Sequence, residues 1–266
     1  MKKLLIINAD DFGLSRGLNY GIVDAFRNGV VRSTTAMVTM NAIEHAAELS
    51  VANPELAVGL HFVLTLGRPL TNAPSLVGDD GELNKEIWDK AEKNQLVISE
   101  VEKELECQYE KFCKVFGRKP SHIDSHHHVH MIEQIFPTVA RFANNKELPL
   151  RVDPTRISYE TLTKNPVTTS SSFCADFYGD EISSDIFLDL IEREKDGISS
   201  LEIMCHPAYI DQDLLNSNYS MPRLVELQVL TNPNIAKGIA TSGFDLGNFT
   251  NLRMNSQQVN FRTRGR

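Results

Sequence analysis

The chain has 266 residues, 41% of them hydrophobic and 23% charged, which is typical of a soluble globular protein. A formal net charge of −8 argues against nucleic acid as a partner, because phosphates are bound by clustered Lys and Arg. No apolar stretch reaches the roughly 18 residues needed to span a membrane, and the apolar run after Lys3 is too short for a signal peptide. Four cysteines without CxxC spacing suggest buried thiols in a reducing cytoplasm.

Strand and helix patterns alternate along most of the chain. In chain order the predicted elements are a strand over 4–9, a helix over 18–27, a strand over 33–40, a helix over 42–51 capped by Asn41, a strand over 57–64, a helix over 99–116, a strand over 121–124, a helix over 135–144, a strand over 148–152, a helix over 184–193, a strand over 200–205, a helix over 222–230, and a final helix and strand within 234–249. Residues 65–97 contain Gly, Pro and Trp88, and are expected to form a lid or a substrate-contacting insertion.

Polar residues stand at or near the ends of several predicted strands. They are Asp10, Asp11, His61, the histidines of residues 122–130, Arg151 and His206. In a parallel barrel the carboxyl ends of the strands form one rim, where the chemistry takes place. The sequence therefore predicts an α/β fold, a distorted (β/α) TIM-like barrel of mostly parallel strands, built as a single domain by residues 1–250. Residues 251–266 are expected to be a polar C-terminal tail.

Five of the eight histidines lie between His122 and His130, together with Asp124. Buried histidines usually occur singly, and imidazole is a common ligand of divalent metals, so the cluster predicts a metal or catalytic site. If the segment is extended, one side carries Asp124, His126, His128 and His130. If it forms a helical turn, His126 and His130 become neighbours instead.

The adjacent carboxylates Asp10 and Asp11 suit metal-dependent hydrolysis. One of them can bind an ion while the other remains free as a general base. Asp11 with two imidazoles would form a three-ligand site with room for water, as in catalytic metal sites. An acidic pair of a phospho-receiver domain is the alternative, but such a domain has about half this length and carries an aspartate where His61 stands.

Six segments resemble the motifs of the YdjC-like carbohydrate deacetylases, and the resemblance extends to about residue 250. They are Asn8-Ala-Asp-Asp-Phe-Gly13, Gly59-Leu-His-Phe62, Phe116-Gly-Arg-Lys-Pro120, His122-Ile-Asp-Ser-His-His-His-Val-His-Met131, Met204-Cys-His-Pro207 and Ser220-Met-Pro-Arg-Leu224. The resemblance implies a metal-dependent enzyme that removes an N-acetyl group from chitobiose- and chitotriose-type sugars, usually as phosphates. It also suggests a homodimer.

The resemblance implies one divalent metal ion, held by Asp11, His61 and His126. It favours Mg²⁺, which usually prefers oxygen ligands. Two imidazoles and one carboxylate suit Zn²⁺ as well, so zinc is the main competitor. The remaining histidines of the cluster are expected to orient ligands, line the pocket or hold the loop.

In the implied reaction Asp10 is the general base, Arg151 its partner and His206 the general acid that protonates the departing amine. These three roles also draw on a similarity to NodB-type deacetylases, which pair a base Asp with an Arg and place an acid His elsewhere. The ion would polarise the acetyl carbonyl and activate water. The products would be acetate and a deacetylated sugar.

Contacts with the sugar are harder to read from the sequence. Candidate stacking surfaces are Phe62, Trp88 and Tyr209, and candidate phosphate contacts are Arg32, Arg68 and Lys85, although core packing and surface solvation are commoner roles for such residues. Two other functions fit the same residues. One is a metal-dependent phosphoesterase on a similar barrel, and the other is a non-catalytic protein that binds sugar or metal.

Overall fold

The computed structural model describes residues 2–215 and 217–252. Its strands are β1 (Lys3–Phe12), β2 (Ser33–Ala36), β3 (Ala57–Phe62), β4 (Ile123–Ser125), β5 (Ser172–Cys174), β6 (Ser200–Cys205) and β7 (Phe244–Gly247). Its helices are α1 (Arg16–Arg27), α2 (Ile43–Val51), α3 (Ile87–Glu92), α4 (Ile98–Phe116), α5 (Phe136–Lys146), α6 (Tyr159–Lys164), α7 (Ser184–Glu194), α8 (Met221–Leu230) and α9 (Pro233–Thr241), with 3-10 turns η1 (His126–Met131) and η2 (Phe249–Asn251).

The sheet is parallel and is built around β1. Its strand order is β4-β3-β2-β1-β6-β5, and β7 also pairs with β1. Along one edge of β1, residues Lys3 to Ile6 pair with β7, and Asn8 to Phe12 pair with β2. The other edge of β1 pairs with β6. The first strand therefore holds three partners and places its carboxyl end in the middle of the sheet.

The sheet curls until its edge strands are linked by single residues. Ile123 of β4 forms an isolated parallel bridge with Leu150, and the backbone N–H of Leu150 donates to the carbonyl of Thr168, shortly before β5. The wall between β4 and β5 is thus irregular backbone rather than two full strands. This arrangement confirms the predicted distorted barrel.

Alternation of side chains gives the curled sheet an apolar outer face and an inner face that becomes polar toward the carboxyl end of β1, beyond a small apolar cluster around Ile6 and Phe249. Leu5, Ile7 and Ala9 of β1 pack in the main apolar core, so Asn8 and Asp10 point to the opposite, inner side. The register of the neighbouring strands adds further buried polar residues to this inner face: Thr35, His61, Asp124 and Glu202. Charged chemistry can therefore be built inside the barrel without disturbing the core.

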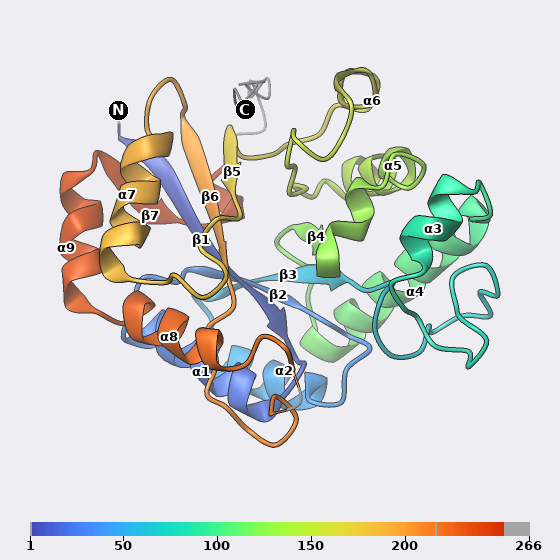
Figure 1. Cartoon of the computed structure of the whole chain (residues 1–266), viewed down its shortest axis with the longest axis horizontal. Helices are drawn as coiled ribbons and strands as arrows, with labels where there is room; N and C mark the ends of the chain where they lie inside the picture. Colours follow the sequence, from blue (N-terminus) through green and yellow to red (C-terminus); the bar gives the residue numbers. More distant parts are fainter. Residues whose placement is uncertain (1, 216, 253–266) are drawn as a thin grey trace.

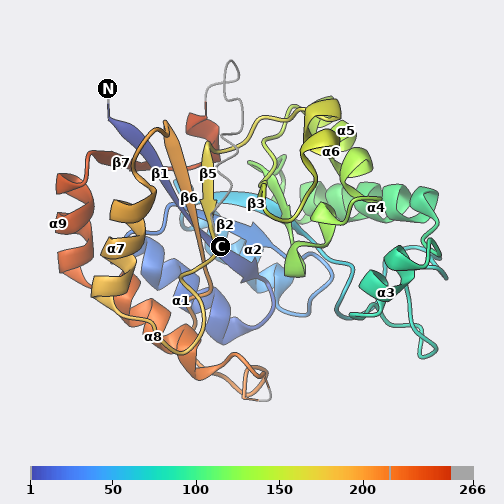
Figure 2. The same cartoon turned by 45° about the horizontal axis from the view of Figure 1, so that its top comes forward.

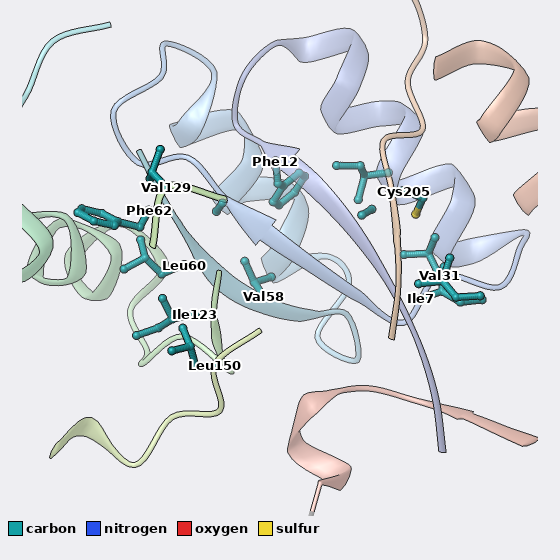
Figure 3. Close-up of a cluster of buried hydrophobic side chains, with 14 of the residues drawn as sticks. Ile7, Phe12, Val31, Val58, Leu60, Phe62, Ile123, Val129, Leu150 and Cys205 are labelled. Atoms are coloured by element: carbon teal, nitrogen blue, oxygen red, sulfur yellow. The ribbon is translucent and has the colours of Figure 1, made fainter. Parts of the chain in front are cut away.

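Helices cover the outer face of the sheet and complete that core (Figures 1 and 2). Helix α1 packs against α2 and α8, α4 packs against α2 and α5, and α7 packs against α9. Figure 3 shows part of the core, with Leu60, Ile123 and Leu150 together near the irregular wall and Ile7 beside Val31. In the described part of the chain, no helix is both long and apolar enough to cross a bilayer.

Residues 65–97 form the predicted insertion between β3 and α4, and they contain the short helix α3 with Trp88. In both views this segment lies at the side of the molecule opposite α9, beside α4 (Figures 1 and 2). The backbone N–H groups of Leu70 and Thr71 donate to the fully buried carboxylate of Glu104 on α4. Hydrogen bonds to this buried carboxylate therefore hold the insertion against the barrel.

Several predicted elements differ in detail. The strand expected over 148–152 is reduced to the single bridge at Leu150, and residues 153–183 contain α6 and β5, which were not predicted. Asn41 does not cap α2, whose N-cap residue is Ala42 and makes no side-chain cap bond. Most of the predicted tail, residues 253–266, lies outside the described residues, so the domain limits remain a prediction.

Candidate metal centre

The carboxyl end of β1 is bulged, and this places Asp10 and Asp11 together. Between Ala9 and Phe12 the strand has one residue more than β2, and Asp11 has a left-handed φ of 71°. Such a backbone is costly for a residue with a side chain and is typical of functional sites. The bulge breaks the alternation, so both carboxylates face the same cavity.

Oδ1 of Asp11 faces two imidazoles. It lies 3.3 Å from Nε2 of His61 and 3.0 Å from Nδ1 of His126, and ligand atoms of the three residues all lie within 4.8 Å of one another. Oδ1 is buried and has no partner with hydrogen-bond geometry. An orphaned carboxylate oxygen beside two imidazole nitrogens fits a divalent cation with N and O ligands. The three expected ligands are therefore brought together.

His61 is held by residues behind it on the inner face. Its Nδ1 lies 2.7 Å from Asp124 Oδ1 and 3.1 Å from Thr35 Oγ1, which leaves Nε2 directed at Asp11. Burial alone would lower the pKa of His61, but the carboxylates of Asp124 and Asp11 raise it to about 10. A cation that takes Nε2 must therefore displace a proton. A carboxylate behind a ligating imidazole is the usual support of such sites.

His126 comes from the turn η1, directly after β4. His127 and His128 have left-handed φ values of 54° and 59°, so the chain is neither the extended segment nor the regular helical turn that the sequence left open. His126 points at Asp11, whereas His130 is buried: its Nε2 donates to the Arg151 carbonyl and its Nδ1 is hydrogen-bonded to the Ser125 hydroxyl. The turn therefore directs His126 toward Asp11, while the hydrogen bonds of His130 hold the turn in place.

Asp10 is bound on both of its oxygens. Arg151 donates to Oδ2 at 2.6 Å and to Oδ1 at 2.7 Å, and Asn8 Nδ2 also donates to Oδ1. Burial alone would raise the pKa of the Asp10 carboxyl, but the Arg151 guanidinium holds it well below its ordinary value. Arg151 also lies 2.9 Å from Asp124 and donates to Glu202 at 2.6 Å, all of them fully buried. Asp10 is thus kept ionised and oriented beside the three-residue cluster.

A second acidic group, Asp10, His61 and Asp124, also brings ligand atoms within 4.8 Å of one another. Its carboxylates are already occupied, because Asp10 binds Arg151 and Asp124 accepts from Thr35 and contacts Arg151. This second group also shares His61 with the first. Among residues 2–215 and 217–252, Asp11 is therefore the carboxylate of these groups that retains a free oxygen for an ion.

His206 follows β6 and lies on the same cavity. Its backbone N–H donates to the fully buried Glu226 of α8, and its Nδ1 lies 3.7 Å from Glu226 Oε1 without a hydrogen bond. The rings of Tyr178 and Tyr219 stack at 4.0 Å and both meet His206 edge-on. The two tyrosine rings and the hydrogen bond from its backbone to Glu226 hold the His206 imidazole in place at the cavity.

The cavity has a volume of about 760 Å³ and is large enough for a short oligosaccharide. All four of the residues Asp10, Asp11, His61 and His126 line it, as does His206. Further lining residues supply aromatic rings and cations: Trp88, Tyr178, Tyr219, Lys85, Arg156 and Arg223. A polar, aromatic-edged pocket around a candidate metal centre suits a carbohydrate.

Some residues considered from the sequence lie elsewhere. Phe62 is fully buried in the core, and His122 stacks on Phe249 at 3.7 Å, away from the cavity. Tyr209 donates to Asp24 and is not part of the cavity lining. Arg32 donates to three backbone carbonyls, and Arg68 pairs with Glu82, so neither is a cavity residue.

The sequence reasoning missed Glu202, Glu226 and Arg223 as parts of the site. Arg223 donates to Oδ2 of Asp11 at 2.8 Å, across more than 200 residues of sequence. Glu202 lies inside the strand predicted over 200–205, where it is the only charged residue. Arg223 stands in Ser220-Met-Pro-Arg-Leu224, a segment that was noted without a role. The sequence shows that these charged residues are present, but it does not show which side chains they contact.

Comparison with known proteins identifies the family of this chain. Residues 4–241 match the family described as YdjC-like protein. The chain belongs to this family. It is 56% identical over 250 residues to a chitooligosaccharide deacetylase from Yersinia pestis (strain Pestoides F), which covers 94% of this chain and 99% of that protein.

Solved structures extend the comparison to the fold. This chain resembles the solved structure of a protein from Enterococcus faecalis V583 that is described as a putative cellobiose-phosphate cleavage protein. The TM-score is 0.88 and the identity 35%, and the match covers 96% of this chain and 100% of that chain. An uncharacterised protein from Agrobacterium tumefaciens C58 shares the fold alone, with a TM-score of 0.51, 12% identity, and coverage of 95% and 89%.

Proposed function

We propose that this protein is a divalent-metal-dependent hydrolase that removes an N-acetyl group from short chitooligosaccharides and releases acetate. The observation that carries the proposal is the buried, unbonded Oδ1 of Asp11 facing His61 and His126, beside an arginine-held Asp10. The identity to the Yersinia chitooligosaccharide deacetylase supports the acetyl group and the sugar class. We also propose a cytoplasmic location and a homodimer, which follow from the cysteines and from the family resemblance.

The proposed roles follow from the contacts of each side chain. Asp11, His61 and His126 would hold a divalent ion, which would supply Lewis-acid chemistry by polarising the acetyl carbonyl and lowering the pKa of water. Asp10 takes a proton from the attacking water, since Arg151 keeps this carboxylate ionised. His206 gives a proton to the departing amine nitrogen, because an amide leaves as an amine only when it is protonated.

Ligand chemistry and the family resemblance favour different metal ions. Two imidazoles and one carboxylate are softer ligands than Mg²⁺ usually takes and suit Zn²⁺. The family resemblance favours Mg²⁺, which we keep as the proposed ion with Zn²⁺ as its competitor. Elemental analysis of protein purified without added metal or chelator decides between them.

The cavity indicates how a sugar would lie. Trp88 on α3 borders the side of His127, with ring centroids 6.3 Å apart, and the Tyr178 and Tyr219 stack borders the side of His206. We propose that sugar rings pack on these two aromatic surfaces, with the acetamido group between them at the metal centre. Lys85 and Arg156 line the same cavity and can meet a phosphate on the sugar.

Acetate release from chitobiose, measured with and without a chelator, tests the proposal. We expect release by the metal-loaded protein, loss on chelation, and recovery when metal is added back. The two other functions predict different results. A phosphoesterase would release phosphate from a sugar phosphate while leaving the acetyl group intact, and a binding protein would retain chitobiose without any acetate being formed.

A further inference from the structure

We propose that Arg223 is a positioning residue that holds one oxygen of Asp11, so that this carboxylate offers a metal ion the other oxygen alone. The inference deepens the proposed metal site and rests on it. Arg223 enters in the first turn of α8, within the otherwise unexplained segment 220–224. Figure 1 shows the chain entering α8 at the end of the molecule toward which β1 points.

The guanidinium is itself held in place. Nε of Arg223 donates to the carbonyl of Tyr219 at 2.9 Å, and the Tyr219 ring lies 5.5 Å from its central carbon. The side chain is only 7% exposed. From this fixed position its Nη2 donates to Oδ2 of Asp11 at 2.8 Å. A planar, buried guanidinium with two directed bonds can fix a carboxylate in a way that a flexible amine cannot.

The two arginines of the site treat the two adjacent carboxylates differently. Arg151 donates to both oxygens of Asp10, so each has a cation beside it and keeps a lone pair for a proton, but neither is left unpaired to face an ion. Arg223 takes Oδ2 of Asp11 and leaves Oδ1, the atom that faces His61 and His126. Because Asp11 also has a left-handed backbone, it needs an outside contact to keep its side chain in place. Arg223 therefore distinguishes the metal ligand from the base.

The test uses Co²⁺ as the probe, because its visible absorption depends on the number and arrangement of its ligands. Metal-free wild type, Arg223→Lys and Arg223→Met are titrated with Co²⁺, and affinity and spectrum are recorded. Arg223→Lys retains the charge and loses the second directed bond, so it isolates positioning from electrostatics. Arg141→Met, which removes an exposed pair with Glu102 remote from the cavity, is the matched control.

We expect the Kd of Arg223→Lys for Co²⁺ to rise by about 10- to 100-fold, the usual effect of losing a residue that supports a ligand. We expect both Arg223 variants to change the Co²⁺ spectrum, because Asp11 can then offer both oxygens. The control should keep the wild-type Kd and spectrum. Wild-type Kd and spectrum in both Arg223 variants would overturn the inference. The readout does not involve acetate, so a protein that binds Co²⁺ but fails to deacetylate chitobiose refutes the proposed function separately.

Discussion

Replacing Arg151 by methionine is expected to destabilise the metal-free protein severely. Its guanidinium contacts Asp10, Asp124 and Glu202 at 2.6 to 2.9 Å, and all four side chains are at most 3% exposed. Removing one partner of a buried ion pair costs about 3–5 kcal/mol, because a charge is left uncompensated in a medium that solvates it poorly. Here three carboxylates lose the same cation.

Two features keep the cost within that range at neutral pH. Burial raises the pKa of Glu202 to about 7, despite the opposing effect of Arg151, so this carboxyl can take up a proton. The imidazole of His61 also remains beside Asp124 as a possible counter-charge. We therefore expect the free energy of unfolding to fall by about 3–5 kcal/mol near neutral pH, and by less in acid, where the carboxyls become protonated.

Urea unfolding of the metal-free protein, extrapolated to zero denaturant, measures this change. Arg141→Met is again the control, since its pair with Glu102 is 54% exposed on both sides and should contribute less than about 1 kcal/mol. A loss for Arg151→Met that is no larger than that of the control would refute the reasoning. It would mean that the buried carboxylates are neutralised by some other group.

Three further predictions concern individual roles. His126→Ala should lose metal, whereas His206→Ala should keep it and lose about 10²- to 10⁴-fold in kcat; elemental analysis that finds His206→Ala without metal contradicts this division. Trp88→Ala should raise KM for chitobiose by up to about tenfold with kcat retained, as expected for about 0.5–1.5 kcal/mol of ring packing, and an unchanged KM would remove Trp88 from the binding surface. Glu202→Gln should flatten the pH dependence of stability: because burial raises the folded pKa of Glu202 from 4.5 to about 7, wild type loses stability as pH rises through that window. Urea titrations at about pH 5 and about pH 8 measure the slope, and an equal slope in both proteins would show that Glu202 stays ionised.

The ends of the strands could be predicted because each is marked locally. A run of apolar residues followed by Asp10 and Asp11, or by His206, needs no knowledge of the rest of the chain. The same holds for the barrel class, which follows from the alternation of strands and helices. Asp11, His61 and His126 came from three separate strand ends, and the parallel sheet brings them to one rim.

The remaining parts of the site depend on contacts that no local pattern encodes. Arg223 and Glu226 lie one turn apart on α8, and only the packing of this helix against α1 directs them to Asp11 and His206. The left-handed backbone at His127 was equally hidden, because such conformations are strained for histidine and are imposed by the surrounding structure. Predictions from hydrophobic periodicity assume a regular backbone, so they fail at the left-handed residues of the site.

The central place of β1 in the sheet has a consequence for how the protein is made. During synthesis β1 emerges before β6 and β7, two of its partner strands, which follow it in the chain by more than 180 residues. Until then one edge of β1 is without its ladder and Asp11 is without Arg223. Chains generally fold as whole domains once they are complete. Until β6 and α8 have been made, the nascent chain should therefore expose an unpaired strand edge and the buried carboxylates of an incomplete pocket.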